Sequence, residues 1–374
     1  MTLERLALRG TPTERGRTHG EAFAAEIRTN VERYLDRFAH YGIEADRARE
    51  MAAEFVPLVT DADAAYATEM EAIADASGVP LVDVALLNAR YEVMYAAYAD
   101  AAAGGADPKP DGCTSFAVRG DVTADGRPRM GQNWDWIPGV EGFIMDVRGG
   151  DVADHVAFTE AGIVGGKIGV NEHGIAMALN GLVTAADGEH PFRTPYHVRF
   201  RNVLDADRLS EAVGAIVEGN RACSANVVLG AAAGEFLNLE ALPESVTYVE
   251  PRDGILTHAN HLEAATGATS RFEQLLPDTV CRSPRLERLL ERGVPTLTEA
   301  DLKDALRDHF DEPSSICRHV DSGLPDEEQT VTRVSAVIDI ADGRLDVTDG
   351  APCEAAYRSF ALADVEGNAT TGRR

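Results

Sequence analysis

Lysine is almost missing from this chain of 374 residues, although charged residues are abundant. Lys109, Lys167 and Lys303 are the only lysines, and Lys plus Arg total 35 against 62 Asp plus Glu. The formal net charge of −27 repels nucleic acids and anionic membranes, so we expect neither as a partner. Because the acidic residues are spread along the chain, they favour a surface adapted to high salt, as in a haloarchaeon, where ions screen the repulsion. An ordinary acidic cytoplasmic protein is the alternative.

Long apolar runs are absent as well. No segment approaches the roughly 20 apolar residues that cross a bilayer. The first residues, Met1-Thr2-Leu3-Glu4-Arg5, lack the basic start and apolar core of a secretory signal. We therefore expect a cytoplasmic protein.

The cysteines are few and far apart, and no CxxC pair occurs. The five are Cys113, Cys223, Cys281, Cys317 and Cys353. This number and spacing predict neither a disulfide framework nor a zinc ribbon. We expect no cofactor.

The chain changes character near residue 112. Apolar residues recur at helical spacing between residues 21 and 98, with stops near Gly42 and Gly78. Residues 101–111 are rich in Gly, Pro and Ala, and predict an exposed connection. Beyond them, strands are predicted at 114–119, 129–134, 142–147, 155–159, 334–340 and 345–347, and helices at 206–218, 284–291 and 298–309. Strands surrounded by helices indicate an α+β layered fold.

The junction Gly112-Cys113 lies where the helical part meets the strand-rich part. Cleavage before Cys113 would give this residue a free α-amino group, which can accept the proton of its own thiol. One residue would then supply both nucleophile and base, and glycine before it tolerates a distorted backbone. A buried structural cysteine is the alternative explanation.

Two later segments place polar side chains in apolar, strand-like surroundings. Asp135 stands between Trp134 and Trp136, and a carboxylate buried there needs partners such as the Cys113 amino group. A turn or capping aspartate is equally compatible with this segment. Asn180 ends an apolar strand that follows a predicted hairpin at 171–174, and its amide could point into a site.

Two more segments carry candidate catalytic groups. His258 and His261 are three residues apart, but no further ligand motif accompanies them, so a zinc site is disfavoured. Asn260 between them is a better candidate, as a donor to an oxyanion. Arg318 could hold a carboxylate in the site or form a structural ion pair.

Taken in order, these segments resemble the acyl-coenzyme A:6-aminopenicillanic acid acyltransferase (isopenicillin N acyltransferase) family. The resemblance covers about residues 10–355. The matching motifs are Gly16-Arg17-Thr18-His19-Gly20, Leu87-Asn88-Ala89-Arg90-Tyr91-Glu92, Gly112-Cys113-Thr114-Ser115, Gly131-Gln132-Asn133-Trp134-Asp135, Gly166-Lys167-Ile168-Gly169 through Asn180, His258-Ala259-Asn260-His261 and Ile316-Cys317-Arg318.

The resemblance implies the four-layer αββα sandwich of N-terminal nucleophile hydrolases. Self-cleavage at Gly112-Cys113 would divide the chain into a helical segment, 1–112, and a catalytic domain, 113–374. Cys113 would attack an acyl amide or an acyl-coenzyme A thioester, Asp135 would lie near its amine, and Asn260 would be the oxyanion donor. Asn180 matches another asparagine of the related bile-salt hydrolases and penicillin V acylases.

The family's late arginine does not align cleanly. Arg318 and Arg333 are both candidates, and Gln329 lies near the expected place. The resemblance also leaves open the acyl group, the acceptor and the oligomeric state. Two other interpretations remain: an unprocessed, papain-like hydrolase in which Cys113 pairs with His258 or His261, and a catalytically silent binding protein of the same fold.

Overall fold

Two β-sheets form the centre of the protein in a computed structural model, which describes residues 3–101, 112–264 and 267–363. The larger sheet has eight strands in the order β1 (Arg5–Arg9), β4 (Gly142–Arg148), β5 (His155–Glu160), β6 (Ile168–Asn171), β7 (Ile175–Gly181), β8 (Ala225–Ala231), β9 (Phe236–Ala241) and β10 (Val246–Val249). The smaller sheet has six, in the order β11 (Ile255–His258), β2 (Cys113–Val118), β3 (Arg129–Trp136), β12 (Val331–Asp339), β13 (Arg344–Val347) and β14 (Arg358–Ala361). All pairs are antiparallel except β1 with β4.

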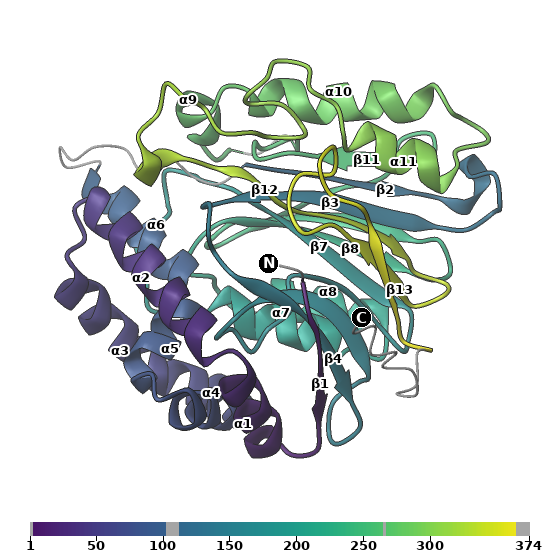
Figure 1. Ribbon diagram of the computed structural model, residues 1–374. Coiled ribbons are helices and arrows are strands. Elements are labelled where there is room, and N and C mark those ends of the chain that lie inside the picture. The colour runs from purple at the N-terminus through teal and green to yellow at the C-terminus, as the bar shows by residue number, and fades with distance from the viewer. Residues whose placement is uncertain (1–2, 102–111, 265–266, 364–374) are drawn as a thin grey trace, which may run out of the picture.

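Helices cover the outer faces of both sheets (Figure 1). Above the six-stranded sheet lie α9 (Phe272–Leu275), α10 (Thr279–Glu291) and α11 (Glu299–Ala305). Beneath the eight-stranded sheet lie α7 (Tyr196–Leu204) and α8 (Leu209–Val217). The flank is formed by α1 (Pro12–Ala22), α2 (Ala24–His40), α3 (Ala45–Ala62), α4 (Ala64–Ser77), α5 (Leu81–Asn88) and α6 (Arg90–Ala101). The predicted αββα sandwich with an adjoining helical segment is thereby confirmed.

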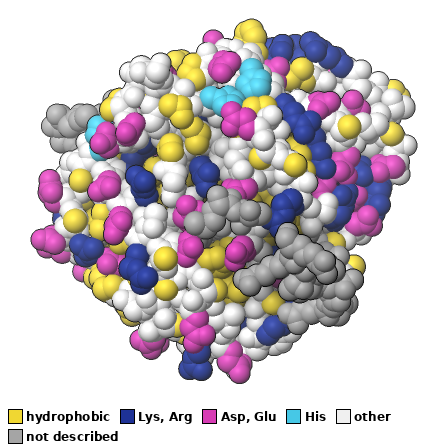
Figure 2. Space-filling view, in the orientation of Figure 1, with side chains coloured by type: hydrophobic (Ala, Val, Ile, Leu, Met, Phe, Trp, Pro, Cys, Tyr) yellow, Lys and Arg dark blue, Asp and Glu magenta, His cyan; other side chains and the backbone are white. Residues whose placement is uncertain are grey.

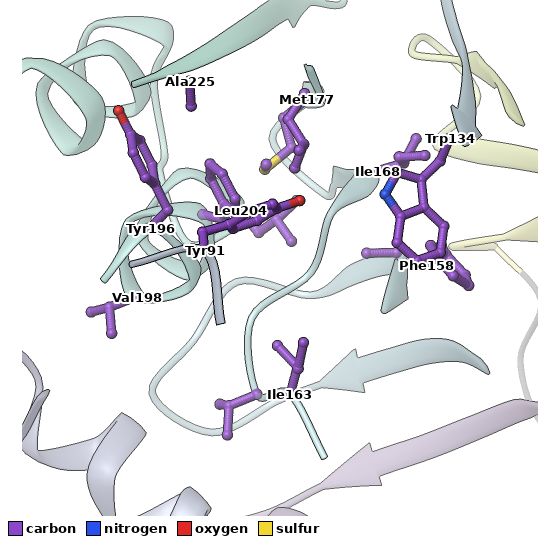
Figure 3. Packing of buried hydrophobic residues seen from close by; sticks show 14 of the residues in the cluster. Tyr91, Trp134, Phe158, Ile163, Ile168, Met177, Tyr196, Val198, Leu204 and Ala225 are labelled. Carbon is purple, nitrogen blue, oxygen red and sulfur yellow. The ribbon is translucent and has the colours of Figure 1, made fainter. Parts of the chain in front are cut away.

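Apolar side chains fill the space between the sheets and beneath the helices. Figure 3 shows Trp134 of β3 against Phe158 of β5 and Ile168 of β6, and the rings of Trp134 and Phe158 lie 5.3 Å apart. A second cluster, which includes Phe116 and Leu286, packs α10 and α11 onto the other face of the six-stranded sheet. Since successive residues of a strand point to opposite faces, β2 and β3 contribute to both layers.

Most of the predicted helices and strands are present, and glycines in turns help to explain where some of them end. Between β2 and β3, Gly126 has a φ angle of +74°, and Gly78, which ends α4, has a φ angle of +69°. Both conformations favour glycine. The predicted connection at 101–111 lies, apart from residue 101, outside the described residues.

The sequence did not reveal β1, the first strand of the N-terminal segment. It pairs in parallel with β4, with Leu8 opposite Val147. Its five residues, RLALR, alternate too briefly to stand out, and the pairing that stabilises them comes from a strand far along the chain. The helix α7 and the strands β8 and β9 were also missed.

Acidic side chains are scattered over the face shown in Figure 2, and basic side chains lie among them. This distribution agrees with the even spread of acidic residues along the sequence. Within the described residues, no helix combines the length and the apolar character that spanning a membrane requires.

We expect the protein to become more stable as salt is added. Ions screen the repulsion among surface carboxylates, so the melting temperature should rise between about 0.1 M and about 1 M potassium chloride. Thermal unfolding followed by circular dichroism measures this, and sodium chloride should act alike because screening is not specific to the cation. A melting temperature that stays constant would contradict the proposed adaptation to high salt.

Candidate active site

The peptide bond between Gly112 and Cys113 lies inside the molecule, at the start of β2. Cys113 pairs with Trp134 of β3 on one side, and β11 flanks the same strand on the other. The side chain of Cys113 has no exposed surface. The thiol is therefore enclosed by the protein.

Both polar groups of this peptide bond have protein partners. The N–H of Cys113 donates to Oδ1 of Asn260 at 2.8 Å. The carbonyl oxygen of Gly112 accepts from the backbone N–H of Asp135 at 2.9 Å. The two sides of the bond are thus fixed by residues from different strands and loops, so its orientation is well defined.

Arg282 on α10 is the residue that holds the next stretch of the strand. Its Nη1 donates to the carbonyl oxygen of Cys113 at 2.5 Å and to Oγ1 of Thr114 at 2.8 Å, and its Nη2 donates to Oδ1 of Asn260 at 2.7 Å. The sequence motifs did not point to Arg282. The signal that could have found it is its spacing of four residues from Asp278 on a helix, where opposite charges meet.

Arg318 lies beside Gly112, the residue before the cysteine. Its Nη2 donates to Oδ2 of Asp278, and its Nε lies 3.5 Å from Oδ2 of Asp135. A Cβ atom added to Gly112 would come within 3.1 Å of this guanidinium group. Glycine therefore leaves room for Arg318, and it does so without the positive φ of the turn glycines.

The other two candidates for the late site residue lie elsewhere. Arg333 donates to the carbonyl oxygen of Val140 at 3.1 and 3.3 Å. Gln329 donates to the carbonyl oxygens of Asp321 and Leu324 at 2.6 and 2.8 Å. Of the three, the structure brings Arg318 to the Gly112-Cys113 peptide.

Asp135 is fully buried, and its carboxylate faces positive charge. Burial raises its pKa to about 7, although the charges of Arg318 and Arg282 and a 2.7 Å hydrogen bond from Thr332 oppose the shift. Asp278 shares these two arginines. Burial also opposes its ionisation, but Arg282 and Arg318 outweigh that effect and lower the pKa of Asp278. The two carboxyls therefore ionise at different pH values.

The carboxylate of Asp135 and the thiol of Cys113 lie on opposite faces of the sheet. Cys113 is paired directly with Trp134, which packs between the two sheets, whereas Asp135, the next residue of β3, points toward the helices. The Cys113 nitrogen donates to Asn260, and it is the main chain of Asp135, not its carboxylate, that contacts the carbonyl oxygen of Gly112.

Asn180 lies on β7 of the facing sheet. Its Oδ1 accepts from Oγ of Ser115 at 2.8 Å and from Nδ2 of Asn226 at 3.2 Å. Ser115 follows Cys113 by two residues on β2 and shares its face. Asn180 is thus connected through Ser115 to β2, the strand that begins with Cys113.

The two histidines beside Asn260 have other partners. Nε2 of His258 is 3.0 Å from Oε1 of Glu240, and its Nδ1 is 2.8 Å from the carbonyl oxygen of Ala259. Burial opposes a charge on His258, but the bond to Glu240 outweighs it and raises the pKa. Because both ring nitrogens face acceptor oxygens, His258 is poorly placed to accept a proton from a thiol. Nδ1 of His261 lies 3.2 Å from Oγ1 of Thr279.

Asn260 itself combines acceptor and donor functions. Its Oδ1 receives the N–H of Cys113 and Nη2 of Arg282, while its Nδ2 donates one of two hydrogens to the carbonyl oxygen of Gly181 at 3.0 Å. These three bonds fix which end of the amide is oxygen. The site is therefore a cysteine with a held peptide nitrogen, an amide group and two buried arginines.

Comparison with known proteins finds relatives of this chain. A model of the family "Acyl-coenzyme A:6-aminopenicillanic acid acyl-transferase" matches residues 122–354. The 40 kDa form of the acyl-coenzyme A:6-aminopenicillanic-acid-acyltransferase of Emericella nidulans is 30% identical over 325 residues, which is 84% of each chain.

Two of the similar solved structures are hydrolases. An N-acylethanolamine-hydrolyzing acid amidase ortholog of Caenorhabditis elegans has 15% identity and a TM-score of 0.46, with 61% of this chain and 93% of that one covered. A conjugated bile acid hydrolase variant of Clostridium perfringens has 12% identity and a TM-score of 0.47, with 68% and 95% covered.

We expect Asp135 to make folding pH-dependent. Its pKa is higher in the folded state than in the unfolded state, so the stability it contributes is fully present below about pH 4 and is lost as the pH rises toward 7. The comparison is best made in a Cys113→Ala chain, which has no thiol at the junction, with and without Asp135→Asn. Urea unfolding at several pH values should show the chain that keeps Asp135 losing up to roughly 4 kcal/mol more than the Asp135→Asn variant over this range. Parallel pH profiles would contradict the burial of an ionisable group there.

Proposed function

Because this chain belongs to the acyl-coenzyme A:6-aminopenicillanic acid acyl-transferase family, we propose that it is a self-processing cysteine enzyme. It would transfer or hydrolyse the acyl group of a small N-acyl amide or an acyl-coenzyme A thioester. The observation that carries the proposal is the hydrogen bonding of the Gly112-Cys113 peptide, whose carbonyl oxygen and nitrogen each face a partner suited to its cleavage. The family match begins at residue 122, so cleavage is inferred from this geometry.

In the first reaction, the thiol sulfur of Cys113 attacks the carbonyl carbon of Gly112. The negative charge that develops on the oxygen is stabilised by the N–H of Asp135, which already lies 2.9 Å away. The C–N bond then breaks, and the nitrogen takes up the proton that the thiol loses. Water hydrolyses the resulting thioester, which leaves a carboxylate on Gly112 and a free thiol and amine on Cys113.

In the mature enzyme, the same amine would serve as the base. Oδ1 of Asn260, which holds the peptide nitrogen at 2.8 Å in the uncut chain, would keep the amine in place. The amine accepts the thiol proton, and the sulfur attacks the substrate carbonyl to form an acyl-cysteine. The second hydrogen on Nδ2 of Asn260 is suited to the oxyanion, since Gly181 takes only one. Water or an amine acceptor then resolves the acyl-cysteine.

Asp135, Arg318 and Asn180 would help to position the reacting groups without taking part in the bond changes. The side chains of Asp135 and Arg318 lie 3.5 Å apart, and the guanidinium group of Arg318 lies beside Gly112. Asn180 would orient the strand of the nucleophile through Ser115. Residues 1–112 and 113–374 would be the two chains of the mature protein.

A papain-like mechanism is the weaker alternative. It requires a histidine that can accept the thiol proton, but His258 is held as a donor by Glu240 and Ala259, and His261 bonds to Thr279. In addition, Cys113 begins a strand, whereas papain-type cysteines begin a helix. The joint presence of Cys113, Asp135 and Asn260 argues against a silent binding protein, which would not need all three.

We expect the purified protein to consist of two chains, 1–112 and 113–374. Intact-mass spectrometry under denaturing conditions measures this directly. Cys113→Ala should remain a single chain, because the attacking sulfur is gone, while Cys281→Ala, at an exposed cysteine, should be cut as usual. Wild-type protein that is uncut and fully active would exclude the N-terminal nucleophile mechanism.

We also expect Asn260→Ala to lower kcat by roughly 100- to 1,000-fold with little change in KM, because an oxyanion donor acts mainly in the transition state. The substitution also removes the acceptor of the Cys113 nitrogen, so self-cleavage should slow and the processed fraction must be isolated before assay. The assay should screen acyl amides and acyl-coenzyme A thioesters, with and without amine acceptors.

His261→Ala is the matched control for Asn260→Ala. It is next to Asn260, is only partly buried, and should keep most of the activity. His258→Ala should also spare the chemistry, although it would leave Glu240 buried without its partner and lower the stability. An inactive His261→Ala together with a near-normal Asn260→Ala would instead favour a histidine base.

A further inference from the structure

A second group of reactive side chains lies apart from Cys113. It consists of His309 after α11, Cys317 and His319 in the loop that leads to β12, and Cys353 after β13. Each residue offers one ligand atom, and the four atoms lie within 4.8 Å of one another. Three separate stretches of chain are thus brought together at one point.

Four of the six distances between these atoms are close to those of a tetrahedral metal site, and the other two, from His309 to the sulfurs, are within 4.8 Å. The two sulfurs are 3.6 Å apart, Nε2 of His319 is 3.6 Å from Sγ of Cys317 and 3.4 Å from Sγ of Cys353, and the Nε2 atoms of His309 and His319 are 3.0 Å apart. Zinc with Zn–S bonds of about 2.3 Å and Zn–N bonds of about 2.0–2.1 Å would separate its ligands by roughly 3.8 Å (S···S), 3.6 Å (S···N) and 3.3 Å (N···N).

The surroundings of His319 support the same interpretation. Its Nε2 points into the group, and its Nδ1 lies 3.6 Å from Oε1 of Glu354. At 3.6 Å this carboxylate is not hydrogen-bonded to the ring, but it places a negative charge beside the nitrogen that faces away from the group, as is common for histidines that bind metals. Glu354 comes directly after Cys353, so one turn of chain supplies both a ligand and this support.

We propose that His309, Cys317, His319 and Cys353 bind a structural zinc ion. Two thiolates and two imidazoles in a tetrahedron are the donor set that zinc prefers. A disulfide between the cysteines does not explain the geometry, because the sulfurs are 3.6 Å apart, whereas a disulfide needs about 2.05 Å, and it would leave both histidines without a role.

The site would position a residue of the candidate active site. Arg318 lies between the ligands Cys317 and His319, and its side chain reaches Asp278 and passes close to Gly112. Its backbone is held in turn by Thr332, through hydrogen bonds at 2.8 and 3.0 Å. A metal that fixes the residues on both sides of Arg318 limits where its guanidinium group can go. Zinc binding itself does not depend on the proposed activity.

The test measures zinc in the full-length protein, after treatment with a chelator and titration with one equivalent of zinc under reducing conditions. Elemental analysis after gel filtration should find about one zinc per chain. Cys353→Ser and His309→Gln, both at exposed positions, should bring this close to none, while Cys281→Ser should keep it. The last variant also lacks one exposed cysteine but leaves the group intact.

Cobalt provides a readout that surface carboxylates cannot imitate. Cobalt(II) in the site should give the intense visible bands of a tetrahedral thiolate complex, and these should disappear in Cys353→Ser while the circular dichroism spectrum stays the same. Equal zinc content in Cys353→Ser and wild type, no thiolate bands with cobalt, or a Cys317-Cys353 disulfide in the reduced preparation would each overturn the proposal. Failure of self-cleavage would leave it intact.

Discussion

The candidate site depends on keeping one peptide bond inside a sheet. An unpaired buried N–H or carbonyl group costs about 1–3 kcal/mol, so a chain that buries the Gly112-Cys113 peptide must supply partners for both. Here the partners are Oδ1 of Asn260 and the N–H of Asp135. Each is also suited to the breaking bond, because one binds the departing nitrogen and the other binds the oxygen that gains charge. The requirements of folding and of the proposed cleavage coincide in these two contacts.

Buried ion pairs surround the residues that contact this peptide. Asp278 joins Arg282 and Arg318, and Arg318 also faces Asp135. Buried arginines are tolerated when carboxylates compensate them, and removing one partner leaves a charge that is costly to bury. Arg282 and Arg318 bind the same oxygen of Asp278, and Arg282 also binds the main chain at the carbonyl oxygen of Cys113. A Cβ at residue 112 would lie 3.1 Å from the guanidinium group of Arg318, so glycine gives this side chain more room.

The sequence revealed features that depend on local order or on motifs. The strands of the β2–β3 hairpin, the helix end at Gly78 and the segments around Cys113, Asp135 and Asn260 could be found because their signals lie within a few residues. The elements themselves predicted an α+β layered fold, and the four-layer sandwich followed from the resemblance of those segments to a known family.

What could not be predicted depends on contacts between distant segments. Arg282 approaches Cys113 across 169 residues, and no local pattern announces that contact. The partner of His258 is Glu240 on another strand, so its role as a donor was hidden. The four metal-ligand candidates come from three loops with no common spacing, and the rule that zinc sites show CxxC pairs therefore passed over them. β1 depends on its pairing with β4.

Cleavage before Cys113 would not by itself release the N-terminal segment. β1 remains paired with β4, so the segment contributes a strand to the eight-stranded sheet. Arg90 of α6 and Lys167 each lie 2.6 Å from Oε1 of Glu160, and Tyr34 of α2 donates to the other oxygen of the same carboxylate. All of these groups are buried, and separating the chains would leave their charges without partners. The proposed cleavage therefore creates an amine at Cys113 and a carboxylate at Gly112 within a structure that the rest of the contacts keep together.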